Sequence, residues 1–149
     1  MGIVINRALD VPRFADLLGQ LKVAPAPPVR AIRLVSGGPV ERARGFVLHS
    51  ADWTGEGTLQ VDGEIALTAS LDVLSVIAGG AGPAQAVLAL GYAGWGAGQL
   101  DLEIQANGWL TAPADAALVF EMDDATKWRR ALAKLRVDPL LLSAAAGRA

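Results

Sequence analysis

The feature of this sequence that most constrains its fold is a long stretch without charge, between Asp72 and Asp101. A helix that spans a bilayer needs about 20 apolar residues, and this stretch is long enough. Glycines interrupt it twice, around 79–82 and again from Gly91 to Gly98, and acidic residues rather than basic anchors flank it. The pattern therefore predicts a buried helix, a turn and a buried strand within a globular core, and not a membrane span.

Composition narrows the class of protein further. Hydrophobic residues make up 52% of the 149 residues and charged residues 19%, which excludes disorder and favours one compact domain over residues 1–149. The chain has no cysteine and one histidine, so thiolate and paired-imidazole metal sites are excluded, and no cofactor is implied. The first residues lack the pattern of a secretory signal peptide, so we expect a cytoplasmic protein.

Apolar runs and turn residues predict a mixed α+β domain without internal repeats. Asp62-Gly63 between two strand-like runs predicts a β-hairpin. The proline-rich segment 24–28 predicts an extended connector. Strands are expected over residues 2–6, 30–35, 45–49, 58–61, 64–68, 84–90, 109–111 and 117–120. Helices are expected between Asp10 and Ala24, between Ser70 and Gly79, over 98–107, from Asp123 or Asp124 to about Arg136, and after Asp138.

Few motifs indicate chemistry. The glycine-rich segment 94–100 fails the dinucleotide pattern, because its third glycine would have to stand at Gln99. Gln99, Glu103 and Asn107 are spaced to share one helix face. A carboxylate between amides can act as a general base or line a groove, although a solvated helix face explains the same spacing.

Three further features have both a functional and a structural interpretation. His49 ends a predicted strand, but no serine motif of a hydrolase accompanies it, so a hydrogen-bonded structural histidine is favoured. Arg44 follows a glycine turn and could hold an anion, but an ion pair within a loop is favoured. The basic helix Lys127–Arg136 could follow phosphates, but an amphipathic solvated helix is favoured.

Several motifs together point to a family. Residues 91–100 read GYAGWGAGQL, and Glu103-Ile104 and Asn107-Gly108-Trp109-Leu110 follow. Residues 37–49 contain GGPV and then RGFVLH, and residues 2–7 read GIVINR. Together these segments resemble the YqgE/AlgH family of bacterial proteins over the whole chain. Ala8 replaces a usual proline, and Arg148 replaces the histidine of the family's terminal Gly-His-Ala, which removes any role for that histidine here.

The resemblance implies a compact α+β fold with a strongly curved, partly barrel-like mixed sheet flanked by three to four helices. It implies no reaction, since most members are uncharacterised and part of the family is labelled as transcriptional regulators. Members usually have a further segment before the GIVINR-like strand. We therefore expect a misassigned start codon or a truncated chain, with an exposed sheet edge or cleft that favours self-association.

We expect a cytoplasmic binding or regulatory module rather than an enzyme, with a groove for a protein or a small-molecule partner and with neither cofactor nor metal. Direct binding to nucleic acid or to a membrane is not expected, because the net charge is −2. Two alternatives stay open: a hydrolase-like enzyme that uses Glu103 or His49, and a regulator that binds nucleic acid through Lys127–Arg136. The residues expected to line the groove stand at family-motif positions: Asn6, Arg7, Arg44, Trp95, Gln99, Glu103 and Asn107.

Overall fold

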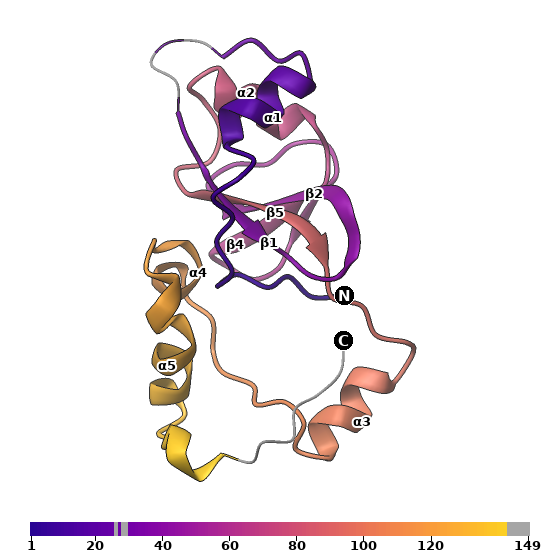
Figure 1. The fold of residues 1–149 in the computed structure, drawn as a ribbon, viewed down its shortest axis with the longest axis vertical. Helices are drawn as coiled ribbons and strands as arrows, with labels where there is room; N and C mark the ends of the chain where they lie inside the picture. The colour runs from indigo at the N-terminus through magenta and orange to yellow at the C-terminus, as the bar shows by residue number, and fades with distance from the viewer. Residues whose placement is uncertain (26, 28–29, 143–149) are drawn as a thin grey trace.

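The computed structural model describes residues 1–25, 27 and 30–142. Its strands are β1 (Arg33–Ser36), β2 (Val40–Ser50), β3 (Thr58–Gln60), β4 (Ile65–Thr68) and β5 (Ala86–Tyr92). They form one five-stranded sheet in the order β1-β5-β2-β4-β3. β1 runs parallel to β5, and the other neighbouring strands are antiparallel. The sheet is curved but open, because β1 and β3 end it without meeting (Figure 1).

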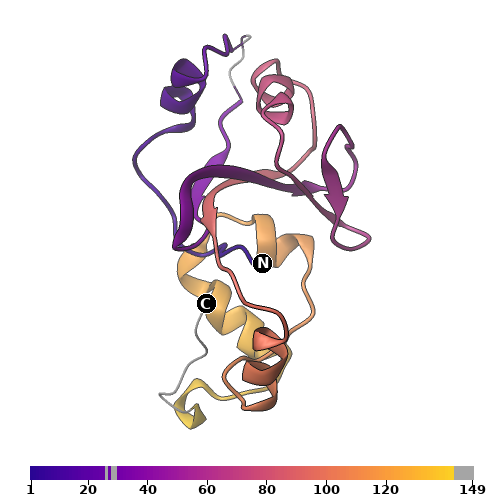
Figure 2. The ribbon, with the colours of Figure 1, turned by 90° about the vertical axis from the view of Figure 1, so that its right-hand side faces the viewer.

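Helices lie on both sides of this sheet. They are α1 (Phe14–Gln20), α2 (Asp72–Ala78), α3 (Gln99–Gln105), α4 (Ala116–Phe120) and α5 (Asp124–Lys134), with a final 3-10 turn, Pro139–Leu141. Figure 2 shows the sheet as a middle layer, with α1 and α2 on one side and α4 and α5 on the other. α3 stands away from the sheet, at the end of the connector that leaves β5 (Figure 1).

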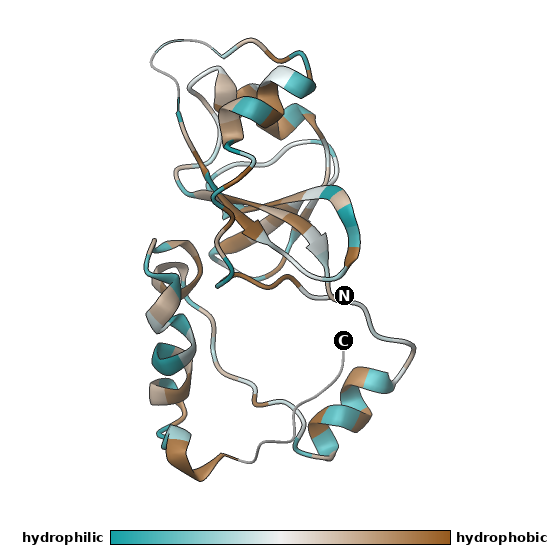
Figure 3. Ribbon diagram, in the orientation of Figure 1, coloured by the Kyte–Doolittle hydropathy of each residue, from teal (hydrophilic) through white to brown (hydrophobic). Residues whose placement is uncertain are grey.

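Two apolar cores follow from this layering, one on each face of the sheet. Side chains alternate between faces along a strand, so Leu88 of β5 packs with α1 and α2, whereas Val87 and Ala89 pack with α4. Burial on both faces explains why β5 is an almost continuous apolar run. Figure 3 shows hydrophobic residues along the central strands and recurring hydrophilic residues along α5.

Two turns that the sequence predicts are present. β3 and β4 form the expected hairpin, and the Asp62 carboxylate accepts hydrogen bonds from the N–H groups of Glu64 and Ile65, both at 2.8 Å. α2 ends as expected at Gly79, and Gly80 follows with a φ of 81°. This left-handed conformation costs glycine little, because glycine has no Cβ to collide with the backbone.

Three predicted strands need correction. Residues 117–120 belong to helix α4, because the Asp115 carboxylate caps the N–H of Leu118 at 2.6 Å and begins a helix there. Residues 109–111 form no regular element. Residues 2–6 make no ladder; Gly2 forms a single bridge with Ala93. The described chain therefore has five α-helices where three to four were expected.

Some expectations concern residues that the structure does not describe. They include part of the predicted connector 24–28, of which residues 26 and 28 lie outside the described ranges. The family-like ending, with Arg148, also lies outside them.

The two glycine motifs of the sequence cross each other beside the sheet. A Cβ on Gly37 would collide with the carbonyl of Gly91, and one on Gly38 would collide with the backbone of Tyr92. Only glycine permits so close an approach of two backbones. The crossing also fixes the N-terminal segment, because the N–H of Val4 donates to the Gly37 carbonyl at 2.8 Å.

Candidate binding groove

Glu103 of α3 lies at the centre of a polar cluster. Its carboxylate accepts hydrogen bonds from the indole N–H groups of Trp95 at 3.3 Å and Trp109 at 2.5 Å. It also accepts one from the Gln99 amide at 2.9 Å. The two indole rings meet edge to face, with centroids 5.7 Å apart. We call Trp95, Gln99, Glu103 and Trp109 the indole–carboxylate cluster.

The ends of α3 explain how this cluster forms. The positions of Gln99 and Glu103, one helical turn apart, bring their side chains together. The helix ends with Asn107 in the left-handed conformation, at a φ of 59°. The N–H of Gly108 then donates to the Glu103 carbonyl at 2.7 Å and that of Asn107 to the Ile104 carbonyl at 3.0 Å, which together form a Schellman motif. The chain reverses there and returns Trp109 to Glu103.

A groove of about 690 Å³ opens beside this cluster. One wall is the extended segment 2–7, and another holds the rings of Trp95 and Trp109. The walls touch at Gly2, where an added Cβ would lie 3.0 Å from the Trp95 ring. We call this cavity the N-terminal groove; its remaining lining residues are Ser36, Gly38, Pro39, Arg42 and Ala93.

The N-terminal groove carries positive charge. Arg7 and Arg42 line it, and both are exposed. Across the described ranges neither guanidinium has a hydrogen bond or an ion pair with another residue. No described carboxylate or histidine is part of the lining. The groove therefore presents two free cations beside aromatic rings.

A second cavity, of about 490 Å³, lies on the other side of Trp109. It separates the loop after α3 from α5, and Asn107 and Trp128 are part of its lining. Leu132 and Leu135 make most of its α5 side apolar.

The structure gathers most of the residues that the sequence predicts for a site. Asn6, Arg7 and Trp95 line the N-terminal groove, and Gln99 and Glu103 hold its tryptophan wall. The other two predicted residues lie elsewhere. Asn107 faces the second cavity, and the guanidinium of Arg44 pairs with Glu41 at 3.1 Å and lies over the Phe46 ring.

Sequence reasoning missed most of the lining residues, among them a cation and an aromatic ring, Arg42 and Trp109. Trp109 is part of the family-like motif, so its position could have suggested it. No sequence pattern indicated that Arg42 lines the groove, because Arg42 lies in an irregular part of β2 where the pairing with β5 shifts between Val40 and Gly45.

His49 is buried and has the structural role that the sequence favoured. Its Nδ1 lies 2.9 Å from the Ser50 carbonyl, which can only accept, so Nδ1 carries a proton. Its Nε2 lies 2.9 Å from the hydroxyl of Thr68, and the Trp53 ring packs edge to face against it. Within the described ranges, no three His, Cys, Asp or Glu side chains are grouped to hold a metal ion.

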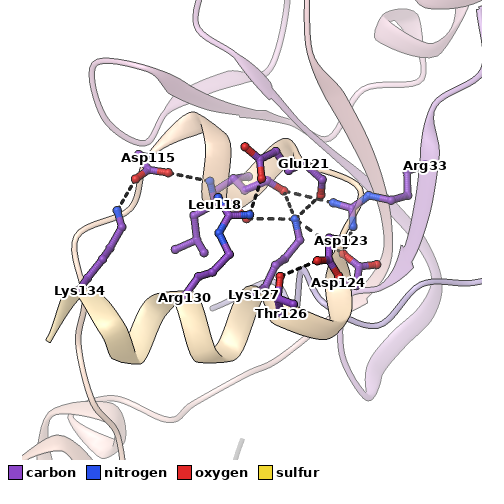
Figure 4. Close-up of polar contacts among 11 residues, drawn as sticks. Arg33, Asp115, Leu118, Glu121, Asp123, Asp124, Thr126, Lys127, Arg130 and Lys134 are labelled. Atoms are coloured by element: carbon purple, nitrogen blue, oxygen red, sulfur yellow. Dashed lines mark hydrogen bonds and ion pairs between the residues drawn. The ribbon is translucent and has the colours of Figure 1, made fainter. Parts of the chain in front are cut away.

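The Lys127, Arg130 and Lys134 side chains of α5 point toward α4 (Figure 4), and of these three only Lys127 is buried. Lys127 is buried and donates to the carbonyls of Leu118 and Val119, both at 3.0 Å, and of Glu121 at 2.6 Å. This burial lowers the pKa of Lys127 below its ordinary value.

Two other cations of α5 have acidic partners. Arg130 pairs with Glu121, and Lys134 pairs with Asp115 (Figure 4). The hydrogen bond from Lys134 lowers the pKa of the Asp115 carboxyl.

A buried ion pair attaches α5 to the sheet, between Arg33 of β1 and Asp124 (Figure 4). Arg33 also donates to the Val119 carbonyl at 3.1 Å. Side-chain alternation along the strand expected over residues 30–35 predicts Arg33 on the face opposite Ile32 and Leu34. The structure confirms this placement, since Ile32 and Leu34 pack in the core with α1 and α2.

Comparison with known proteins identifies the family. A family model described as AlgH-like matches residues 1–140. The chain belongs to the AlgH-like family. It is 56% identical to a UPF0301 protein of Gluconobacter oxydans over 150 residues, which cover all of this chain and 80% of that relative. A UPF0301 protein of Rhodospirillum rubrum is also 56% identical, with 78% of its length covered.

The AlgH-like fold itself has been determined in a relative. The solution structure of AlgH from Pseudomonas aeruginosa superposes with a TM-score of 0.77 at 45% identity, over all of this chain and 79% of that one. This agreement confirms the α+β fold expected for an AlgH-like chain. The names of these relatives state no reaction, ligand or partner. None of the helices in the described ranges is long and apolar enough to cross a bilayer.

Proposed function

We propose that this AlgH-like chain is a non-enzymatic binding or regulatory module, and that its N-terminal groove takes a segment of a partner protein. One observation carries the proposal. Asn6 and Arg7 line one groove together with Trp95, which is far from them in the sequence, and Glu103 fixes the aromatic wall of that groove. A concave site with rigid aromatic rings and a few placed polar groups is typical of recognition surfaces.

The chemistry of the groove favours binding over catalysis. Its described lining offers no carboxylate or imidazole as a general base. Glu103 lies behind the tryptophans, where its oxygens accept N–H groups from three side chains. The nitrogens of His49 likewise have partners in the protein. The hydrolase-like alternative therefore lacks an available base at this groove.

Two arginines of β2 provide a matched test of this function. Arg42 lines the groove, whereas Arg44, two residues later and also exposed, pairs with Glu41. The chain and its Arg42→Ala and Arg44→Ala variants would be used to capture proteins from nuclease-treated bacterial lysate. We expect a protein that is retained by the parent and by Arg44→Ala and lost with Arg42→Ala. Retention of the same proteins by all three baits would contradict the proposal.

A further inference from the structure

A second pair of arginines lies at a pocket that shares no lining residue with the N-terminal groove. This pocket has a volume of about 260 Å³ and lies between the beginnings of β1 and β5 and the end of α4. β1 and β5 run parallel, with Arg33 opposite Val87, so residues 30–33 and 84–86 lie side by side. We call this cavity the arginine pocket. Arg30, Arg33 and Gln85 line it, and no described carboxylate does.

Contacts within the protein orient Arg30 without neutralising it. Its guanidinium donates to the carbonyls of Ala84 at 2.7 Å and Ala81 at 3.5 Å. Both acceptors are neutral, and within the described ranges Arg30 forms no ion pair. A guanidinium carries five N–H groups, so Arg30 keeps donors for a ligand. Because the group is already oriented, less side-chain entropy is lost when a ligand binds it.

The charges around Arg33 have a positive excess. One carboxylate, that of Asp124, serves two buried cations, because it pairs with Arg33 and lies 3.7 Å from Lys127 Nζ. Burial is the largest cause of the lowered pKa of Lys127, and the charge of Arg33 is the next. The Nε of Arg33 is also buried and has no acceptor among the described residues. An anion in the arginine pocket would therefore complement this excess of positive charge.

We propose that the arginine pocket binds a small phosphate, either inorganic phosphate or the phosphate group of a monoester. Arg30 and the Gln85 amide donate to its oxygens, and Arg33 adds positive charge beside them. A phosphate group offers three strong acceptor oxygens and a charge of roughly −1.5 to −2, which complements two guanidinium groups better than a single carboxylate does. The volume lies below the roughly 300–1,000 Å³ of pockets for drug-sized ligands, which favours a small anion.

NMR titrations at constant ionic strength test the proposal, with inorganic phosphate, phenyl phosphate and acetate as ligands. We expect both phosphates to bind saturably and acetate to bind about tenfold or more weakly. The tighter of the two phosphates shows whether the pocket prefers the free ion or a monoester. Arg30→Gln removes a charge from the pocket and should weaken phosphate binding about tenfold. Arg44→Gln is the matched control and should bind phosphate as the parent does, because Arg44 is exposed, pairs with Glu41 and lies outside the lining.

The same spectra locate the bound phosphate. The backbone N–H signals of Ala31 and Ala86, which line the arginine pocket, should shift, and that of the buried Leu18 should not. Circular dichroism would verify that Arg30→Gln folds. If it does not fold, Gln85→Ala removes an exposed amide from the lining and should also weaken phosphate binding.

Other outcomes would overturn the phosphate site. Phosphate binding as weak as that of acetate would show that the pocket does not select a phosphate. Equal weakening by Arg30→Gln and Arg44→Gln would mean that phosphate responds only to the net charge of the chain. Binding that leaves the signals of Ala31 and Ala86 unchanged would place the anion elsewhere. Capture of a partner protein through Arg42 is tested separately, so the proposed function does not depend on these results.

Discussion

At the scale of residues, Glu103 organises the candidate site. Its spacing from Gln99 was enough to predict that the two side chains share a helix face. The same pattern placed Asn107 on that face, but α3 ends at Gln105 and Asn107 takes the left-handed turn that follows. The contact with Trp109 depends on that chain reversal, which side-chain spacing along a helix does not encode.

Replacing Glu103 tests this organisation. Glu103→Ala leaves two indole N–H groups without their acceptor, so we expect the free energy of unfolding to fall by about 1–3 kcal/mol. Glu103→Gln keeps one acceptor oxygen, so its free energy of unfolding should fall by less. Urea denaturation followed by circular dichroism measures both. Unchanged stability of Glu103→Ala would show that the cluster is not held by its carboxylate.

The burial of Lys127 predicts that the free energy of unfolding depends on pH. Burial lowers its pKa in the folded chain below the ordinary value of 10.5, so the unfolded chain binds its proton more tightly. Stability should therefore rise with pH between the lowered folded pKa and about 10.5. Below the folded pKa both states are protonated, and this contribution no longer changes with pH.

The variant Lys127→Met isolates this effect. It should be less stable than the parent, because three carbonyls lose their donor, and its stability should rise less steeply in that alkaline range. Urea unfolding at several pH values gives the slope of stability against pH for the parent chain and for the variant. Identical slopes would mean that Lys127 titrates in the folded protein as it does in the unfolded chain.

At the scale of elements, local sequence patterns predicted the strand face that attaches α4 and α5 to the sheet, but not that residues 117–120 are helical. Strand alternation predicted correctly that Arg33 faces away from Ile32. The short apolar run 117–120 fits a strand or one turn of helix equally well. The cap at Asp115 and the packing of Val119 and Phe120 select the helix.

Substitutions of Arg33 and Asp124 should have strongly coupled effects on the free energy of unfolding. Both side chains are largely buried, at 7% and 12% exposure. Asp124→Leu leaves the buried Arg33 and Lys127 without their carboxylate, so this variant alone should cost about 3–5 kcal/mol. After Arg33→Leu, Asp124 keeps Lys127 at 3.7 Å, so the loss of stability should be smaller. Arg33 Nε and Asp124 Oδ2 already lack partners among the described residues. The double variant should therefore cost less than the sum of the two single variants in a double-mutant cycle. Additive losses would contradict this coupling.

At the scale of the whole molecule, the site forms where three distant segments meet: the chain start, the glycine crossing and α3. Periodicity and turn residues predicted the fold class and most elements, and the family resemblance predicted a curved sheet. A groove with residues of the family-like motifs was predicted too, but not its full lining, because its walls come from residues 2–7, the glycine crossing, β2 and the loops before and after α3. Contacts between such remote segments are decided by packing rather than by local sequence.

The charge distribution of the molecule predicts weak interaction with nucleic acid. The net charge is −2, and Lys127, Arg130 and Lys134 already have partners within the chain. Titration with a labelled DNA duplex at low salt should therefore show no saturable binding. Tight binding that weakens steeply with added salt would instead support the nucleic-acid alternative.

The most direct test of the account compares NMR spectra of the chain with and without the protein that it captures from lysate. Binding in the N-terminal groove should shift the indole N–H signals of Trp95 and Trp109 and the backbone N–H signal of Asn6, which line it. The backbone N–H signal of the buried Leu18, which does not line the groove, should stay unchanged. If the captured protein shifts other signals and leaves those of Trp95, Trp109 and Asn6 unchanged, the N-terminal groove is not the binding site.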